Sequence, residues 1–244
     1  MSGSMGAAIA DKIAKQRLNV IMLVDCSSSM RGERIAQVNE AIRDIKKYLT
    51  EMQSENTNVD FYITVITYST DAFFLNRDKC KPIEEFDFKD IKGGGWSNLH
   101  IAYERLADIL KKESQGGIMP DYGGVAPIIL LMTDGHPTKD NVKEELSALK
   151  KLPWFKVALK YGIAIELNDK RTIGCLTDFV SGNGDVIECY DSRLLERIIK
   201  IIVLTASKVK STSTSVYAEK NVSVTEEVKQ QVQQAIAEVD DWEW

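Results

Sequence analysis

Apolar runs alternate with amphipathic stretches along most of the chain. Residues 20–24 (VIMLV) are five apolar residues in a row, which predicts a buried strand of a parallel sheet. Further strands are expected at residues 59–68, 127–132, 155–165 and 185–189. Helices are expected at residues 33–52, 97–110, 141–149, 170–180 and 192–209, and short extended pieces at 72–75 and 83–86. This alternation predicts an α/β fold with a doubly wound, mostly parallel sheet, helices on both faces and one antiparallel edge strand.

Oxygen-bearing side chains follow two of the predicted buried strands. Asp25, Ser27 and Ser29 stand at alternate positions after the first strand, and Asp134 follows the strand at residues 127–132. Ligands of such a sheet bind beyond the carboxyl ends of its strands. Few carboxylates combined with neutral hydroxyls suit Mg²⁺, which binds oxygens and keeps room for water or an incoming anion. We therefore expect a Mg²⁺ site at this edge, with Mn²⁺ as an alternative ion.

The spacing of these residues resembles the metal-ion-dependent adhesion site (MIDAS) of von Willebrand factor A (VWA) domains. Ser97 follows a run of glycines and stands where this family usually carries Thr. The resemblance implies a Rossmann-like VWA fold. It also implies that Ser27, Ser29 and Ser97 offer hydroxyl oxygens to the ion, while Asp25 and Asp134 act directly or through bound waters.

Four positions near the expected ion need separate comment. Ser97 keeps the hydroxyl of the usual Thr but lacks the methyl group that stiffens the Thr rotamer. Ser28 stands where Gly is frequent in the family. Trp96 is bulky, and it either lines the rim to which a partner binds or packs under the glycine run. His136 is a second rim candidate, with an ordinary surface position as the alternative.

Each expected ligand also has an ordinary structural interpretation. Asp25 and Ser27 are suited to cap the helix that follows them, and Ser97 is a common type of helix N-cap. Ser29 fits a plain loop, and Asp134 before a glycine is typical of a strand that ends in a turn. The order and spacing of the three segments together favour the metal site.

The net charge of −5 is concentrated in residues 211–244, where seven acidic residues minus two lysines account for the whole deficit. The rest of the chain is near neutral, so nucleic acid is not an expected partner. The four cysteines form no CxxC pair, and no segment reaches the roughly 18 uninterrupted apolar residues of a membrane span. The first ten residues lack the features of a secretory signal, so a cytoplasmic protein is expected.

Three segments are expected: an N-terminal extension at residues 1–16, a VWA domain at 17–209, and an acidic linker with an amphipathic helix and tail at 210–244. The apolar stripe of that helix either docks on its own domain or enters a groove of a partner, where Trp242 and Trp244 are candidate anchors. A third interpretation brings the end of the tail to the metal site of a neighbouring molecule. Hydroxyls suited to accept phosphate from a partner kinase are those of Ser211, Thr212, Ser213, Thr214, Ser215 and Thr225.

An ion with an open position favours recognition of a partner's carboxylate, so we expect a protein-binding scaffold or adaptor rather than an enzyme. The chain also resembles stand-alone bacterial A domains of the TerY (tellurium-resistance-associated) type. That resemblance implies a regulatory role in a stress-response module with a protein kinase and a PP2C-type phosphatase. The alternative is a metal-dependent hydrolase or phosphatase acting on phosphoesters, although Ser27 replaces the second acid of haloacid dehalogenase-type phosphatases and no hydrolase elbow or nucleotide-binding glycine motif is present.

Overall fold

A seven-stranded sheet forms the centre of the molecule. The computed structural model describes residues 15–55, 59–135, 137–138, 142–166, 170–181, 184–210 and 217–240. The strands are β1 (Gln16–Asp25), β2 (Val59–Tyr68), β3 (Ala72–Phe74), β4 (Lys81–Pro82), β5 (Ile128–Thr133), β6 (Leu159–Ile165) and β7 (Gly184–Cys189). Their order is β3-β2-β1-β5-β6-β7, and β4 also pairs with β2.

The directions of the strands agree with the predicted topology. Strands β2, β1, β5, β6 and β7 pair in parallel, whereas β3 and β4 are antiparallel to β2. Register places Asp25 opposite Tyr68, so the ends of β1 and β2 lie at the same edge. The prediction of a doubly wound, mostly parallel sheet with an antiparallel edge strand is confirmed.

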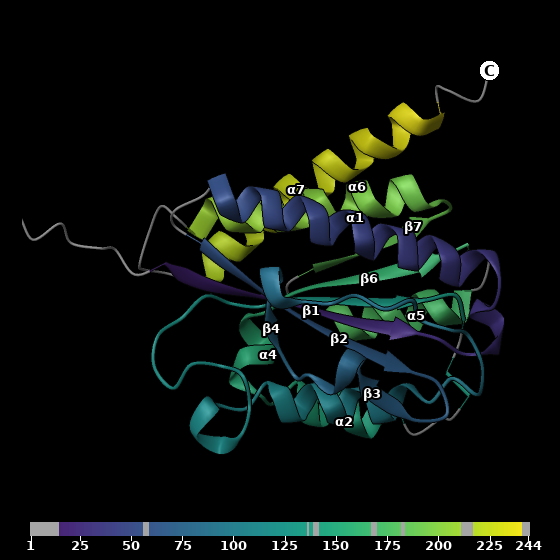
Figure 1. Cartoon of the computed structure of the whole chain (residues 1–244), viewed down its shortest axis with the longest axis horizontal. Coiled ribbons are helices and arrows are strands. Elements are labelled where there is room, and N and C mark those ends of the chain that lie inside the picture. Colours follow the sequence, from purple (N-terminus) through teal and green to yellow (C-terminus); the bar gives the residue numbers. More distant parts are fainter. Residues whose placement is uncertain are drawn as a thin grey trace, which may run out of the picture.

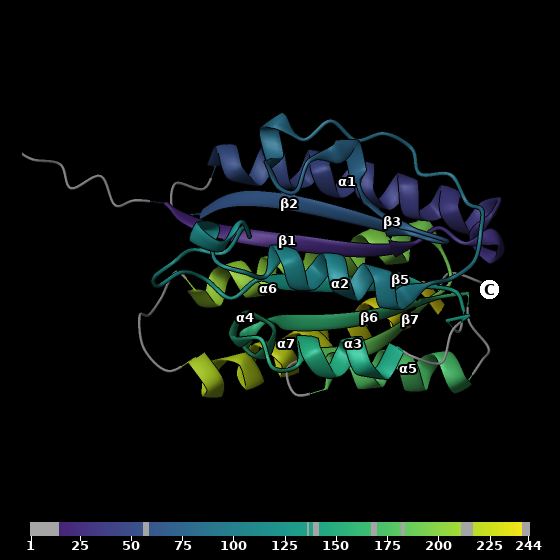
Figure 2. The same cartoon turned by 90° about the horizontal axis from the view of Figure 1, so that it is seen from below.

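Helices cover both faces of the sheet, as Figure 1 and Figure 2 show. One face carries α1 (Glu33–Glu55), α6 (Ser192–Lys210) and α7 (Tyr217–Asp240). The other face carries α2 (Leu99–Ile109), α3 (Val142–Leu149), α4 (Pro153–Val157) and α5 (Lys170–Val180). Four 3₁₀ turns lie in the described connections: η1 (Ser28–Met30), η2 (Leu75–Arg77), η3 (Ile83–Glu85) and η4 (Glu113–Gln115).

Strand β1 is apolar on both sides because it separates two hydrophobic cores. Side chains alternate between the faces of a strand, so neighbouring residues enter different cores. Val20 and Met22 pack with residues of α1 and α6, whereas Ile21 and Leu23 pack with residues of α2 and α3. The buried strand thereby fixes the position of Asp25 at its carboxyl end.

Two local predictions are wrong in detail. The strand expected from residue 155 begins at Leu159, because Pro153 starts the short helix α4, a position that suits proline. Residues 83–85 form the 3₁₀ turn η3 rather than an extended piece. The amphipathic helix expected within residues 210–244 is α7, which begins at Tyr217.

Helix α7 docks on its own domain, which decides between the two main interpretations of its apolar stripe. Val228 is 1% exposed, Val232 3% and Ala235 0%, and the first two belong to the core that α1 and α6 share. An ion pair between Arg197 and Glu238 joins α6 to α7. The described helices include none that is long and apolar enough to cross a bilayer.

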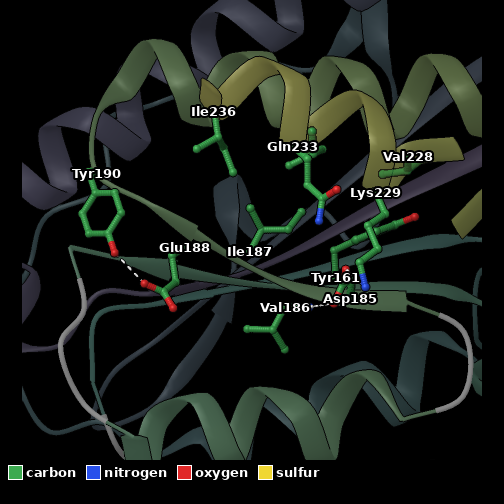
Figure 3. A pocket seen from close by; sticks show the side chains of 11 residues that line it. Tyr161, Asp185, Val186, Ile187, Glu188, Tyr190, Val228, Lys229, Gln233 and Ile236 are labelled. Carbon is green, nitrogen blue, oxygen red and sulfur yellow. Dashed lines mark hydrogen bonds and ion pairs between the residues drawn. The ribbon is translucent and has the colours of Figure 1, made fainter. Parts of the chain in front are cut away.

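A cavity of about 340 Å³ remains between α7 and the edge strand β7 (Figure 3). Apolar side chains that include Ile187 and Ile236 line its middle. The hydrogen bond from Tyr190 to Glu188 lies at one end of it, and Lys229 of α7 lies near Asp185 at the other. The cavity thus belongs to the packing of the C-terminal helix.

Candidate metal centre

The candidate metal centre lies at the carboxyl edge of the sheet, where three loops meet. Backbone hydrogen bonds join the loop after β1 to the glycine run before α2: Gly94 N donates to Cys26 O at 2.7 Å, and Ser28 N donates to Gly95 O at 3.0 Å. A third bond, from Cys26 N to Tyr68 O at 2.8 Å, continues the pairing of β1 with β2. The backbone therefore holds the loops together before any side chain is considered.

Asp25 is the most deeply buried polar group of the centre. Its side chain is 0% exposed, and Oδ1 accepts a hydrogen bond from Ser27 N at 2.8 Å. Oδ2 accepts hydrogen bonds from Ser97 Oγ at 2.9 Å and from Thr133 Oγ1 at 2.8 Å. Burial raises the pKa of Asp25 above its ordinary value, and the hydrogen bonds only partly oppose this effect.

The remaining expected ligands continue from Asp25 as a chain of oxygens, which the backbone N–H of Ser27 links to Asp25 Oδ1. Ser27 Oγ lies 3.1 Å from Ser29 Oγ, and Ser29 Oγ donates to Asp134 Oδ1 at 2.8 Å. The side chain of Asp134 has no exposed surface. All five expected side chains, those of Asp25, Ser27, Ser29, Ser97 and Asp134, are therefore brought together by the fold.

The spacing of these oxygens fits a small divalent cation. Mg²⁺ binds six oxygens at 2.0–2.1 Å in an octahedron, so neighbouring ligands are about 2.9 Å apart. The oxygen pairs Ser97–Asp25, Ser27–Ser29 and Ser29–Asp134 are separated by 2.9, 3.1 and 2.8 Å. The described residues contain no cluster of three His, Cys, Asp or Glu side chains suited to a metal. Serine hydroxyls are thus required to complete a ligand set.

Sequence reasoning missed an arginine at the edge of this cluster. Arg34 Nη1 donates to Asp134 Oδ2 at 2.6 Å and to Ser29 O at 3.2 Å, while its Nε donates to Glu166 Oε2 at 3.0 Å. The hydrogen bond to Glu166 is the first cause that raises the pKa of Arg34. Arg34 lies in the first turn of α1, where the helix dipole disfavours a cation. That position was a signal that Arg34 needs an acidic partner.

Two threonines that support the cluster were also missed. Thr133, the last residue of β5, donates its hydroxyl to Asp25 Oδ2 at 2.8 Å. Thr138 Oγ1 accepts a hydrogen bond from Ser97 N at 3.1 Å, and Thr138 N donates to Ser97 O at 2.8 Å. Both threonines therefore orient expected ligands.

The glycine run before Ser97 is tightly enclosed, and Trp96 projects from it. A β-carbon on Gly93 would lie 3.0 Å from Arg31 N, and one on Gly94 would lie 3.1 Å from Arg31 Nη2. Gly95 has φ +92°, and a β-carbon there would lie 2.6 Å from Thr70 Oγ1. Trp96 is 65% exposed, so it does not pack under this run.

Several expected functional residues lie outside the part of the chain that the structure describes. They are His136, Trp242, Trp244, the hydroxyls at residues 211–215 and the side chain of Thr225. The other histidine, His100, lies in the first turn of α2 and is 8% exposed.

Comparisons with known proteins place this architecture. A family model described as von Willebrand factor type A domain matches residues 19–180. Inter-alpha-trypsin inhibitor heavy chain H1 of Sus scrofa is 27% identical over 137 residues, which cover 52% of this chain and 14% of the relative. Heavy chain H2 of Mesocricetus auratus is 29% identical over 136 residues, covering 54% and 13%. The chain therefore spans only a small part of the length of these relatives.

Solved structures share the fold at low sequence identity. The type A structure from Catenulispora acidiphila has a TM-score of 0.56 at 12% identity and covers 78% of this chain and 43% of that chain. Proximal thread matrix protein 1 from the mussel byssus, with a zinc-occupied MIDAS motif, has a TM-score of 0.55 at 18% identity and covers 79% and 48%. The vWF domain of the pilus tip protein Mfa5 from Porphyromonas gingivalis has a TM-score of 0.56 at 12% identity and covers 83% and 98%. Given the match of the family model over most of the sheet, the chain belongs to the von Willebrand factor type A domain family.

Proposed function

We propose that this chain is a protein-binding module that holds a divalent cation, Mg²⁺ in the first place, and uses it to bind a carboxylate of a partner protein. The observation that carries the proposal is the chain of oxygens from Ser97 through Asp25, Ser27 and Ser29 to Asp134, with separations of 2.8–3.1 Å where side chains meet. The zinc-occupied MIDAS of the mussel protein supports a divalent ion in this fold. Mn²⁺ has the same preference for oxygen ligands.

The roles of the ligands follow from their charge. Asp25 and Asp134 supply two negative charges, whereas Ser27, Ser29 and Ser97 supply neutral oxygens. An ion held in this way keeps a strong attraction for one more anionic oxygen. When bound, the ion would attract a carboxylate electrostatically, and the chain's own residues would hold the ion in place.

The rim of the site supports a protein as the ligand. Trp96 is 65% exposed beside Ser97, and it offers the large flat surface that is frequent at binding hot spots. Arg31 is also exposed, and its Nε donates to Gly93 O at 3.1 Å, which holds the side chain against the glycine run. A partner segment with one acidic residue beside an apolar residue fits this combination.

A narrower role follows from the sequence resemblance to TerY-type proteins. In that role the chain is an adaptor in a bacterial stress-response module of the cytoplasm, bound to a protein kinase and a PP2C-type phosphatase. It rests on that resemblance alone, and phosphorylation at Ser211–Ser215 or Thr225 would belong to it. The alternative from the sequence, metal-dependent hydrolysis of phosphoesters, has no observation among the described residues in its favour.

The test is metal titration followed by capture of a partner. Isothermal titration of the chelator-treated protein with Mg²⁺ and Mn²⁺ is expected to show one site, which the double variant Asp25→Ala, Ser29→Ala lacks. The matched control is Ser28→Ala, in the same loop but outside the oxygen chain. Capture of cellular proteins is then compared in Mg²⁺ and in chelator. A wild-type protein that binds neither ion, or a partner whose capture ignores chelator, overturns the proposal.

A further inference from the structure

Arg34 places a fixed positive charge against the candidate metal centre. Its Nη1 lies 2.6 Å from Asp134 Oδ2, while Asp134 Oδ1 accepts the hydroxyl of Ser29 within the oxygen chain. The two oxygens of one carboxylate are thus divided between the arginine and the ligand cluster. The Arg34 side chain is 34% exposed, whereas that of Asp134 has no exposed surface.

The arginine is held in this position by residues outside the metal centre. Glu166 accepts from Arg34 Nε at 3.0 Å through Oε2 and from Gln37 Nε2 at 2.8 Å through Oε1. Glu166 has φ +48°, an uncommon backbone conformation for a residue other than glycine. Its backbone N–H donates to Cys189 O at 2.8 Å. A strained backbone conformation persists only where the surrounding structure enforces it, so the surroundings of Glu166 fix its position.

We propose, on the basis of the function proposed above, that Arg34 is an internal counter-cation that competes with the divalent ion for Asp134 and so lowers the metal affinity of the site. Without the ion, Arg34 neutralises Asp134 and keeps the cluster in shape. With the ion, the same carboxylate serves two cations, which repel each other. The attraction between Arg34 and Asp134 therefore stabilises the ion-free state more than the ion-bound state.

Thermodynamic linkage gives the direction of the effect. Because Arg34 stabilises the ion-free state preferentially, its removal tightens the binding of the ion. A divalent and a monovalent cation about 6 Å apart in a water-like medium repel each other enough to change the affinity about tenfold. If Arg34 instead served only to position Asp134, its removal would weaken the binding. The two roles thus differ in sign.

The experiment measures Mg²⁺ affinity by isothermal titration for wild type, Arg34→Gln, Arg34→Met and Arg34→Lys. We expect Arg34→Gln and Arg34→Met to bind about tenfold more tightly. Arg34→Lys keeps the charge and is expected to remain close to wild type. The matched control is Arg43→Gln, which removes an arginine of the same helix that pairs with the exposed Asp90, and it is expected to change the affinity less than twofold.

Two further measurements keep the inference testable if an Arg34 variant folds poorly. Glu166→Gln removes the second acid of Arg34, so the whole positive charge acts on Asp134 and Mg²⁺ is expected to bind more weakly. Thermal unfolding is also followed in chelator and in Mg²⁺, and the rise in Tm on adding Mg²⁺ is expected to be larger for Arg34→Gln than for wild type.

The outcomes separate this inference from the function on which it rests. If wild type binds Mg²⁺ but Arg34→Gln and Arg34→Met bind it equally or more weakly, the counter-cation role is overturned and the metal-dependent function stands. If neither wild type nor these variants bind a divalent ion, the proposed function itself fails.

Discussion

Two ionisable side chains are buried at opposite ends of the parallel strands, and they have different hydrogen-bond partners. Asp25, at the carboxyl end of β1, is 0% exposed, and Lys160, near the amino end of β6, is 2% exposed. Lys160 Nζ donates to Phe155 O and Ala158 O, both at 3.1 Å, and lies 5.0 Å from the centre of the Phe155 ring. Burial is the first cause of both pKa shifts: it raises the pKa of Asp25 and lowers that of Lys160 to about 8.

The two sites differ in whether the hydrogen-bond partners of the buried group can change from donating to accepting. The two carbonyls around Lys160 belong to the last turn of α4 and to its C-cap residue, and they accept hydrogen bonds only, so the ammonium group completes the end of that helix. Two of the three donors to Asp25 are hydroxyls, of Ser97 and Thr133, which can rotate and present a lone pair instead. The buried carboxylate of Asp25, surrounded by hydroxyls, is therefore suited to bind a cation. The buried ammonium group of Lys160, surrounded by carbonyls, stabilises the fold.

The largest expected effect is on metal affinity at the Asp25 edge. Asp25→Ala removes a charged ligand and is expected to weaken Mg²⁺ binding at least hundredfold, about 3 kcal/mol. Lys160→Met, its counterpart at the other edge, is expected to change the affinity less than twofold. Isothermal titration measures both, and a similar loss in the two variants would remove the distinction between the edges.

The next effect is a pH dependence of stability at the Lys160 edge. The pKa of Lys160 is lowered from 10.5 to about 8 in the folded protein, so the unfolded chain binds more protons between these values. The free energy of unfolding contributed by Lys160 therefore rises with pH, by about 2 kcal/mol from pH 7 to pH 10. Urea unfolding in chelator is expected to show this rise in wild type relative to Lys160→Met. The control Lys156→Met replaces an exposed lysine and keeps Lys160, so it is expected to show the same rise as wild type. A constant difference between wild type and Lys160→Met would contradict it.

A smaller effect is expected for single hydroxyls of the oxygen chain. Ser27→Ala and Ser29→Ala each remove one neutral ligand and are expected to weaken Mg²⁺ binding about tenfold, or about 1.4 kcal/mol. The loss should be larger for Ser29, since its hydroxyl also holds Asp134. Titration of Ser28→Ala gives the baseline. Unchanged affinity in both variants would mean that these hydroxyls are not ligands.

The smallest effect concerns the ion-free protein. Because burial raises the pKa of Asp25, the folded state disfavours the charged carboxylate, and the stability contributed by this group is lost as pH rises through its folded pKa. In chelator at pH 7, Asp25→Asn is therefore expected to be more stable than wild type. The gain should disappear near pH 4. An Asp25→Asn protein that is less stable at pH 7 would show that the charged form is the favoured one.

Local patterns were sufficient to predict the sheet and the convergence of the oxygens. The run at residues 20–24 is apolar on both sides because it separates two hydrophobic cores. An uninterrupted apolar run of this length indicates a strand buried on both faces, and it can be recognised in the sequence of that strand alone. Once parallel strands are recognised, their carboxyl ends must meet at one edge, which brings Asp25 and Asp134 together. The binding of an ion there stays a prediction.

Other features depend on contacts that no local pattern records. Arg34 meets Glu166 across 132 positions of the sequence, and both are ordinary polar residues in their own segments. Phe155 and Val157 extend the apolar pattern of β6, but Pro153 and the cap provided by Lys160 turn this stretch into α4. Whether α7 docks on its own domain depends on the apolar surface left open by α6 and β7, which only the assembled fold shows.

The glycine run before α2 combines an enclosed backbone with one exposed side chain. A β-carbon at Gly95 would meet Thr70 Oγ1 at 2.6 Å, and one at Gly93 would meet the backbone of Arg31 at 3.0 Å, so substitution at either position is expected to shift the segment that carries Ser97. Residue 96 stands among them with its indole ring in solvent. A library of substitutions at residue 96 is therefore expected to yield altered partner specificity without displacing the proposed ligands.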